Sequence, residues 1–123
     1  MTFNQLINEI THNFLESWNV GDFVAIESQL AADIVFESPN ISKLIPENKS
    51  NSVTGRKETV AYLQFFAQQF PEFKFDHEMT EFVKEDRLVV LKGFIAHLNK
   101  YLTGHYYLNE YGKFQLIQIS YSD

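Results

Sequence analysis

The side chains best suited to acid–base chemistry in this sequence are four histidines and six tyrosines. An imidazole titrates near neutral pH and can transfer a proton, and a phenol can donate a hydrogen bond to a carbonyl oxygen. We select His97, His77 and Tyr106 as candidate catalytic residues, because each falls on an apolar face of a predicted strand. Each also has a structural interpretation. His97 could be a residue of the rim or the core whose imidazole is hydrogen-bonded to a hydroxyl. His77 could be a partly buried residue of a strand. Tyr106 could be a packed core residue whose hydroxyl has one hydrogen-bond acceptor.

Motifs of other catalytic classes are absent from the sequence, including G-x-S-x-G, H-E-x-x-H, the Walker loop and G-x-G-x-x-G. Because the chain has no cysteine, we exclude a disulfide scaffold, thiolate catalysis and cysteine-based zinc sites. We expect neither a metal site nor a cofactor, since the histidines are not spaced three or four residues apart on a helix: His12, His77, His97 and His105.

The length of 123 residues, or 14.4 kDa, predicts a single domain spanning residues 1–123. With 16 acidic and 10 basic residues the net charge is −6, which argues against a nucleic-acid partner. No apolar run approaches the roughly 20 residues of a membrane span, and the first residues lack the features of a signal peptide. We therefore expect a soluble, cytoplasmic protein with no membrane partner.

Three helices are predicted in the first part of the chain. Thr2 and Gln5 form a potential capping box for the first helix, and Gly21 ends it. Asp22 can cap a shorter second helix, and the third opens after Gly55. The first helix has an apolar stripe at spacings of three and four: Phe3, Ile7, Ile10, Phe14 and Trp18.

Strands are predicted from alternating and β-branched runs, with a polar loop between the first strand and the third helix. The loop covers residues 40–54. One apolar stripe contains Phe73, Phe75, His77 and Met79. Helices on one face of such a sheet predict an α+β fold. The predicted strands are residues 33–38, 73–79, 87–98, 101–109 and 113–122.

Turn positions then predict which side chains share a face, because opposed residues of antiparallel strands point the same way. A turn at Asn99-Lys100 pairs His97 with Leu102, and a turn at Tyr111-Gly112 pairs Tyr106 with Ile117. The predicted inner face holds His97, Ile95, Leu102, Tyr106, Ile117, Ile119 and Tyr121. The predicted outer face holds Leu88, Val90, Phe94, Ala96, Tyr101, Tyr107, Phe114 and Leu116, with His105 and Lys92.

The apolar outer face predicts a homodimer. A patch of this size would exceed the few hundred Å² that monomers usually expose, and a stable interface needs about 800 Å² from each partner. A two-fold pairing of sheets is the simplest closed arrangement. The alternative is that a loop or the C-terminal residues cover this side within one subunit.

Several short motifs occur along the chain in an order that is typical of one superfamily. They are Phe14-Leu-Glu-Ser-Trp18-Asn-Val-Gly21-Asp22, Leu30-Ala-Ala-Asp33-Ile-Val-Phe-Glu-Ser38-Pro39, Gly55 opening a helix, Gly112-Lys-Phe, and a last strand ending on Tyr121-Ser-Asp123. In these features the chain resembles the nuclear transport factor 2-like superfamily, in particular its SnoaL-like and ketosteroid-isomerase-like branch. The resemblance implies three helices wrapped by a strongly curved mixed or antiparallel sheet, a cone with a deep apolar pocket, and frequent dimerisation.

The catalytic positions of ketosteroid isomerases are not matched. The general-base aspartate of that family falls at Ser38 in this sequence. The tyrosine that binds the oxyanion falls at Phe14, and the second acid falls at or near Gly104. All three residues lack the proton-transfer group, so the resemblance disfavours that mechanism.

We therefore expect a pocket that binds a small apolar or aromatic molecule and that contains His97 or His77. Histidine and tyrosine could supply acid–base catalysis of an isomerase, cyclase or dehydratase type on a carbonyl compound, with Tyr121 as a further hydrogen-bond donor. If the protein is an enzyme, His97→Ala should abolish turnover. The alternatives are a non-catalytic ligand-binding or interaction module and a protein-transport adaptor. The expected binding residues are Phe14, Trp18, Phe36, Ser38, Tyr62, Phe66, Ile95, Leu102, Ile117, Ile119 and Tyr121.

Overall fold

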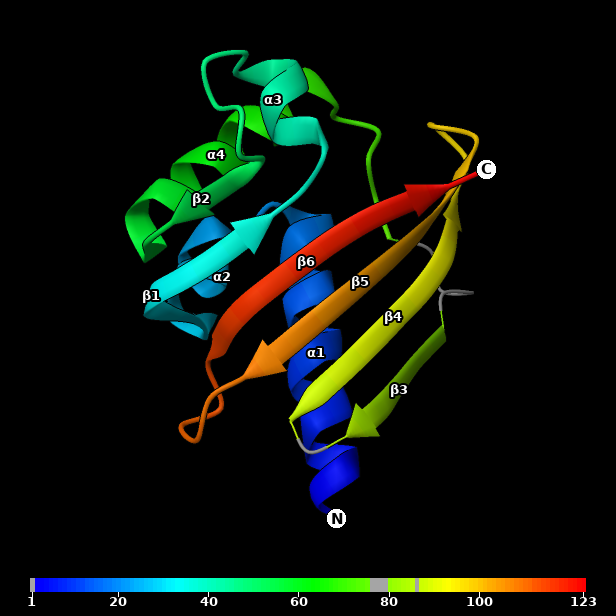
Figure 1. Cartoon of the computed structure of the whole chain (residues 1–123). Helices are drawn as coiled ribbons and strands as arrows, with labels where there is room; N and C mark the ends of the chain where they lie inside the picture. Colours follow the sequence, from blue (N-terminus) through cyan, green and yellow to red (C-terminus); the bar gives the residue numbers. More distant parts are fainter. Residues whose placement is uncertain (1, 76–79, 86) are drawn as a thin grey trace.

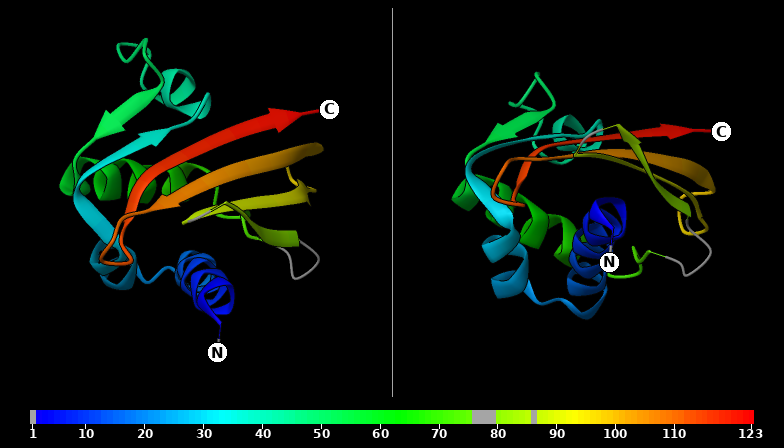
Figure 2. Two further views of the ribbon diagram at one scale, coloured as in Figure 1. Left: turned by 60° about the horizontal axis from the view of Figure 1, so that its bottom comes forward. Right: turned by 90° about the horizontal axis from the view of Figure 1, so that it is seen from below.

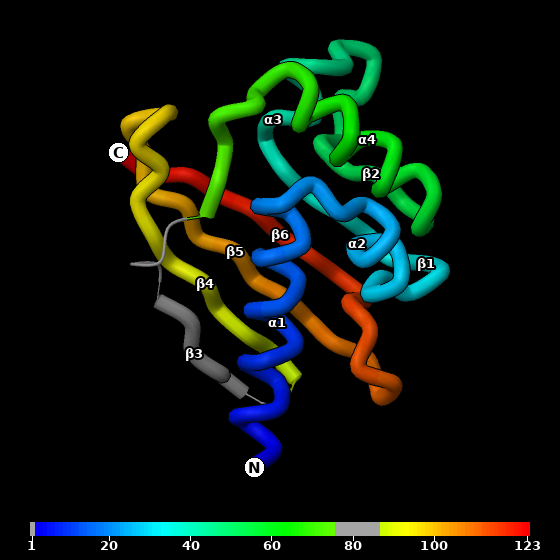
Figure 3. Tube along the Cα trace, turned by 180° about the vertical axis from the view of Figure 1, so that it is seen from behind, coloured from blue at the N-terminus to red at the C-terminus, as the bar shows by residue number. Residues whose placement is uncertain are grey.

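The computed structural model describes residues 2–75, 80–85 and 87–123 of the chain. Within these residues, four helices accompany one six-stranded mixed sheet with the strand order β2-β1-β6-β5-β4-β3 (Figure 1). The sheet is curved and not closed, and α1, α2 and α4 lie on its concave side (Figures 2 and 3). The predicted α+β class, with helices on one face of a curved sheet, is confirmed.

The helices begin and end where the capping residues predict. In α1 (Phe3–Val20), both hydrogen bonds of the capping box between Thr2 and Gln5 are present, and Gly21 ends the helix at φ 73°. In α2 (Phe23–Gln29), Asp22 accepts a hydrogen bond from the backbone N of Ala25 at 3.0 Å. The third long segment, α4 (Arg56–Gln69), follows Gly55 directly. Within the described residues, no helix is both long and apolar enough to cross a membrane.

The sheet is antiparallel except where its first strand lies parallel to its last. The pair β1–β6 is parallel, and each of the other neighbouring pairs is antiparallel. The strands are β1 (Leu30–Glu37), β2 (Ser52–Thr54), β3 (Thr80–Glu85), β4 (Leu88–Ile95), β5 (Lys100–Leu108) and β6 (Phe114–Ser122).

Two predicted segments differ from the structure. The predicted loop 40–54 contains a short helix, α3 (Asn40–Leu44), and the edge strand β2. The side chain of Asn51 organises this segment by accepting a hydrogen bond from the backbone N of Ser42 at 2.8 Å. Of the predicted strand 73–79, residues 73–75 are not in a strand, residues 76–79 lie outside the described residues, and β3 starts at Thr80.

The predicted pairing of β5 with β6 is confirmed, whereas that of β4 with β5 is wrong. Tyr106 pairs with Ile117 as expected. The β4–β5 turn comprises residues 96–99 instead of Asn99-Lys100, so Leu102 pairs with Gly93 and His97 lies in the turn. The observed pairing of β4 with β5 differs from the predicted pairing by an even number of residues. The side chains of both strands therefore still point to the predicted faces, apart from the residues in the turn.

An irregularity between β5 and β6 turns Phe114 inward. The register shifts after Tyr107, so that Leu108 and Phe114 pair and both are buried. Phe114 is 0% exposed and packs against Phe14, with ring centroids 4.9 Å apart. Its assignment to the outer face was therefore wrong, because a bulge reverses the alternation beyond it.

Candidate functional site

An apolar pocket lies between the concave face of the sheet and the helices, with a volume of about 50 Å³. A single buried water needs about 10–15 Å³ of such volume, so the pocket has room for several groups of that size. Aromatic and aliphatic side chains form most of its wall. It is lined by Phe14, Trp18, Phe36, Ser38, Asn40, Tyr62, Leu63, Phe66, Phe73, Phe75, Leu102, Tyr106, Ile117, Ile119 and Tyr121.

Most of the expected binding residues lie around this one pocket. Ile95 is the exception: it is 2% exposed and belongs to the core without lining the pocket. Tyr106, proposed above for catalysis, is in the wall. The expected residues that do line it are Phe14, Trp18, Phe36, Ser38, Tyr62, Phe66, Leu102, Ile117, Ile119 and Tyr121.

Four lining residues are not among the expected binding residues: Asn40, Leu63, Phe73 and Phe75. Phe73 and Phe75 belong to the apolar stripe around His77, which the alternating pattern offers as a possible part of the pocket, although residues 73–75 are not in a strand. Asn40 was assigned to a loop, and nothing in its sequence context marked it. Leu63 lies on α4 among the apolar residues of that helix.

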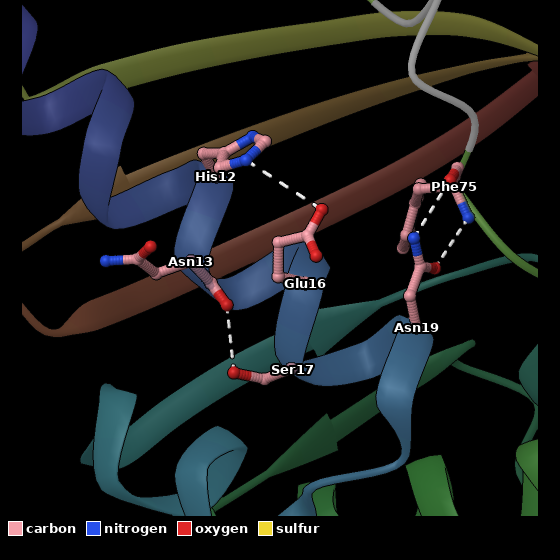
Figure 4. Close-up of polar contacts among 6 residues, drawn as sticks. All are labelled: His12, Asn13, Glu16, Ser17, Asn19 and Phe75. Atoms are coloured by element: carbon pink, nitrogen blue, oxygen red, sulfur yellow. Dashed lines mark hydrogen bonds and ion pairs between the residues drawn. The ribbon is translucent and has the colours of Figure 1, made fainter.

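Hydrogen bonds to α1 hold the segment after α4 as one wall of the pocket. The indole Nε1 of Trp18 donates to the backbone O of Phe73 at 2.9 Å. Asn19 donates to the backbone O of Phe75 at 2.9 Å and accepts from its backbone N at 2.8 Å (Figure 4). These three bonds replace strand pairing for residues 73–75 and direct both phenylalanines toward the pocket.

The polar groups of the pocket gather at one end, which comprises Ser38, Asn40, Tyr62 and Tyr121 and is termed the polar end below. Asn40 donates from Nδ2 to the hydroxyl of Tyr121 at 2.8 Å, and from its backbone N to Oγ of Ser38 at 3.2 Å. The hydroxyl of Tyr62 is buried and forms no hydrogen bond with any described residue. An apolar chamber with a few convergent polar groups is typical of a small-molecule site.

Comparison with known proteins shows the family. A family model for the SnoaL-like domain matches residues 11–106, which is most of the chain. The chain belongs to the SnoaL-like domain family.

Solved structures agree with the fold of this SnoaL-like chain. A SnoaL-like protein of unknown function from Burkholderia thailandensis has a TM-score of 0.81 at 17% identity, covering 100% of this chain and 99% of the other. A protein of unknown function from Mesorhizobium loti, similar to nuclear transport factor 2, has a TM-score of 0.71 at 19% identity, covering 100% and 96%. A candidate polyketide cyclase from Xanthomonas campestris has a TM-score of 0.68 at 14% identity, covering 98% and 93%. No curated protein matches.

The two tyrosines at the polar end of this SnoaL-like domain are hydrogen-bond donors at neutral pH. Burial raises the pKa of Tyr121 to about 12, partly offset by the hydrogen bond from Asn40. Burial, reinforced by the neighbouring Tyr121, raises the pKa of Tyr62 well above its ordinary value, while the nearby Ser38 hydroxyl acts in the opposite direction. Both phenols therefore stay protonated and cannot act as bases near pH 7.

Because its pKa is raised in the folded protein, Tyr121 should make the free energy of unfolding decrease as the pH rises above 10. Above pH 10 the phenol ionises in the unfolded chain, whereas the folded chain keeps its proton until about pH 12. Each step through that window therefore favours unfolding. We expect urea midpoints from circular dichroism to decline more steeply between pH 10 and 11 for the natural chain than for Tyr121→Phe. A difference between the two proteins that stays constant from pH 8 to 11 would contradict the raised pKa.

Of the two candidate catalytic histidines, only His97 is described, and it lies apart from the pocket wall. The side chain of His97 is 34% exposed, in the β4–β5 turn, with Nε2 at 3.9 Å from Oε2 of Glu72 and the ring 6.1 Å from that of Phe70. The expected place of His97 beside Leu102 depended on the wrong turn, so the expectation that the imidazole lies inside the pocket is not met. His77 lies outside the described residues. A catalytic role for either histidine stays a prediction.

Gly104 explains how Tyr106 enters the pocket wall. A Cβ atom built on Gly104 would lie 2.7 Å from Cε2 of Tyr106, so the phenol ring lies directly over the glycine. Gly104 is also at or near the position where the isomerase resemblance places an acid. In this SnoaL-like domain an aromatic ring covers that position instead.

Proposed function

We propose that this protein binds a small apolar or aromatic molecule in the pocket between α1, α4 and the sheet. The observation that carries the proposal is the composition of the wall, which is aromatic or aliphatic except at the polar end. The volume of about 50 Å³ favours a compound of one ring over a large polycyclic one.

A catalytic function of isomerase, cyclase or dehydratase type on a carbonyl compound is the second candidate. It is supported by the fold shared with the candidate polyketide cyclase and by protonated phenols, which can stabilise negative charge on a carbonyl oxygen. Among the described lining residues, however, there is no carboxylate or imidazole to serve as a base. The wall therefore supports binding more strongly than proton transfer.

The single tryptophan of the chain reports directly on binding. Trp18 lines the pocket and its indole N–H is hydrogen-bonded, so its resonance in a ¹H–¹⁵N spectrum needs no assignment. We expect titration with ethylbenzene or acetophenone to move this resonance saturably. The backbone amide of Tyr111, whose side chain is 79% exposed, serves as an internal control. No movement of the indole resonance up to the solubility limit of both compounds would contradict the proposal.

We further propose a homodimer through the outer face of the sheet. Its support is an exposed aromatic pair at the end of β4 and β5: Phe94 is 43% exposed, Tyr101 is 54% exposed, and their rings are 5.1 Å apart. The free patch is smaller than the sequence pattern predicts, because Leu88 and Val90 are already buried within one chain and Phe114 faces inward.

Phe94→Glu is expected to convert the dimer to a monomer, because a charge would have to be buried in the apolar centre of the interface. Light scattering after size exclusion at micromolar concentration should give twice the 14.4 kDa of one chain for the natural protein and the single mass for the variant. Tyr111→Glu, at an exposed aromatic residue in the β5–β6 turn, is the matched control and should stay dimeric. A natural protein that runs at the mass of one chain would refute the dimer.

A further inference from the structure

The buried hydroxyl of Tyr62 lies near the hydroxyl of Ser38 but makes no hydrogen bond of acceptable geometry with a described residue. Tyr62 is 4% exposed, its oxygen forms no hydrogen bond with a described residue, and it belongs to the pocket wall. Buried polar atoms in native proteins are almost always hydrogen-bonded, so an orphaned one in a pocket calls for an explanation such as an absent ligand. A phenol that stays protonated needs an acceptor.

The neighbouring hydroxyl groups of Tyr121 and Ser38 can also act as hydrogen-bond donors. The hydroxyl oxygen of Tyr121 accepts from Asn40, which leaves its own proton for another acceptor. Oγ of Ser38 likewise accepts from the backbone N of Asn40. These three hydroxyls come from α4, from β6 and from the residue that follows β1, and all three residues line the pocket.

The charge of the wall limits what the acceptor can be. No lysine, arginine or histidine occurs among the described residues of the wall, so an anionic group would be buried without a counter-charge. A neutral carbonyl oxygen can receive two hydroxyl donors and carries no such cost. A hydrocarbon would leave Tyr62 unpaired.

We propose that the polar end binds the neutral carbonyl oxygen of a small aromatic or aliphatic ketone, aldehyde or ester, with Tyr62 as the principal donor and Tyr121 as the second. This rests on the proposed function and specifies its ligand class. The apolar part of the ligand then lies against the aromatic part of the wall, which includes Trp18 and Phe66.

Acetophenone and ethylbenzene test this proposal because they have similar size and differ by the carbonyl oxygen. We expect the natural protein to bind acetophenone about tenfold more tightly than ethylbenzene, measured through the Trp18 indole resonance. Tyr62→Phe should bring this ratio close to one, mainly by lowering the affinity for acetophenone. Benzoate, the anionic analogue, should bind more weakly than acetophenone.

Two further measurements separate hydrogen bonding from a structural role. The carbonyl resonance of ¹³C-labelled acetophenone should move downfield on binding to the natural protein and move less in Tyr62→Phe. The melting temperature of Tyr62→Phe should equal or exceed that of the natural protein, since the variant loses an unpaired buried hydroxyl. Tyr101→Phe removes an exposed phenol on the outer face and should leave both affinities unchanged.

The outcomes distinguish this proposal from the one on which it rests. Equal affinity of the natural protein for the two compounds would overturn the carbonyl site and leave the apolar pocket supported. Failure of both compounds to bind would overturn the proposed function. A preference for acetophenone that persists in Tyr62→Phe would overturn the assignment of Tyr62 as the principal donor.

Discussion

Replacing Phe114 by alanine is expected to lower the free energy of unfolding by about 3–5 kcal/mol. The side chain is 0% exposed, and its ring packs 4.9 Å from that of Phe14 and 5.8 Å from that of Tyr106. Truncation would therefore leave a cavity directly beneath the pocket wall, adding to the loss of buried apolar area. Urea denaturation of the two proteins measures the difference.

Leu116→Ala is the matched control for this prediction. Leu116 is half-buried on the same strand and on the opposite side of the bulge, so its truncation should cost clearly less. A loss below about 1 kcal/mol for Phe114→Ala would contradict the inward position and restore the outer-face assignment that simple alternation predicts.

Replacing Ile119 by phenylalanine is expected to weaken binding of acetophenone at least about tenfold, which corresponds to 1.4 kcal/mol. Ile119 is half-buried in the pocket wall, and the additional ring volume would occupy a cavity of about 50 Å³. Because the side chain is partly exposed, the larger ring can be accommodated with little strain on the core. Titration followed by the Trp18 indole resonance gives both affinities.

Ser120→Phe provides the control for Ile119→Phe, because it adds a phenylalanine at the next residue of β6, where the side chain is exposed. Its affinity for acetophenone should equal that of the natural protein. If Ile119→Phe binds as well as Ser120→Phe while both remain folded, the ligand does not occupy this pocket.

Local rules predicted the helices well because each boundary has its own capping residue. Thr2, Gly21 and Asp22 act within one turn of the helices they delimit, so no distant contact is needed to place them. The turn of the β4–β5 hairpin failed for the opposite reason. Asn99 has the left-handed conformation expected of a turn residue, with φ 54°, yet it ends a turn of four residues and does not begin one of two.

The apolar part of the pocket was largely predictable because its wall is also the core. Phe14 and Trp18 belong to the helical stripe, and alternation along β6 gives Ile117 and Ile119. At the polar end, Ser38, Tyr62 and Tyr121 were expected. Asn40 was not, since its position depends on a short helix inside a polar segment. The inward turn of Phe114 depends on a bulge that shifts the register, and no residue of the sequence marks it.

We expect a small carbonyl compound to lie inside this pocket when it is bound to the protein. Intermolecular nuclear Overhauser effects between acetophenone and methyl groups of the ¹³C-labelled protein measure that location directly. We predict contacts from the ligand to the methyl groups of Leu102, Ile117 and Ile119, which line the pocket. Contacts confined to Leu116 and Val35 on the outer face would show that the compound binds outside the pocket.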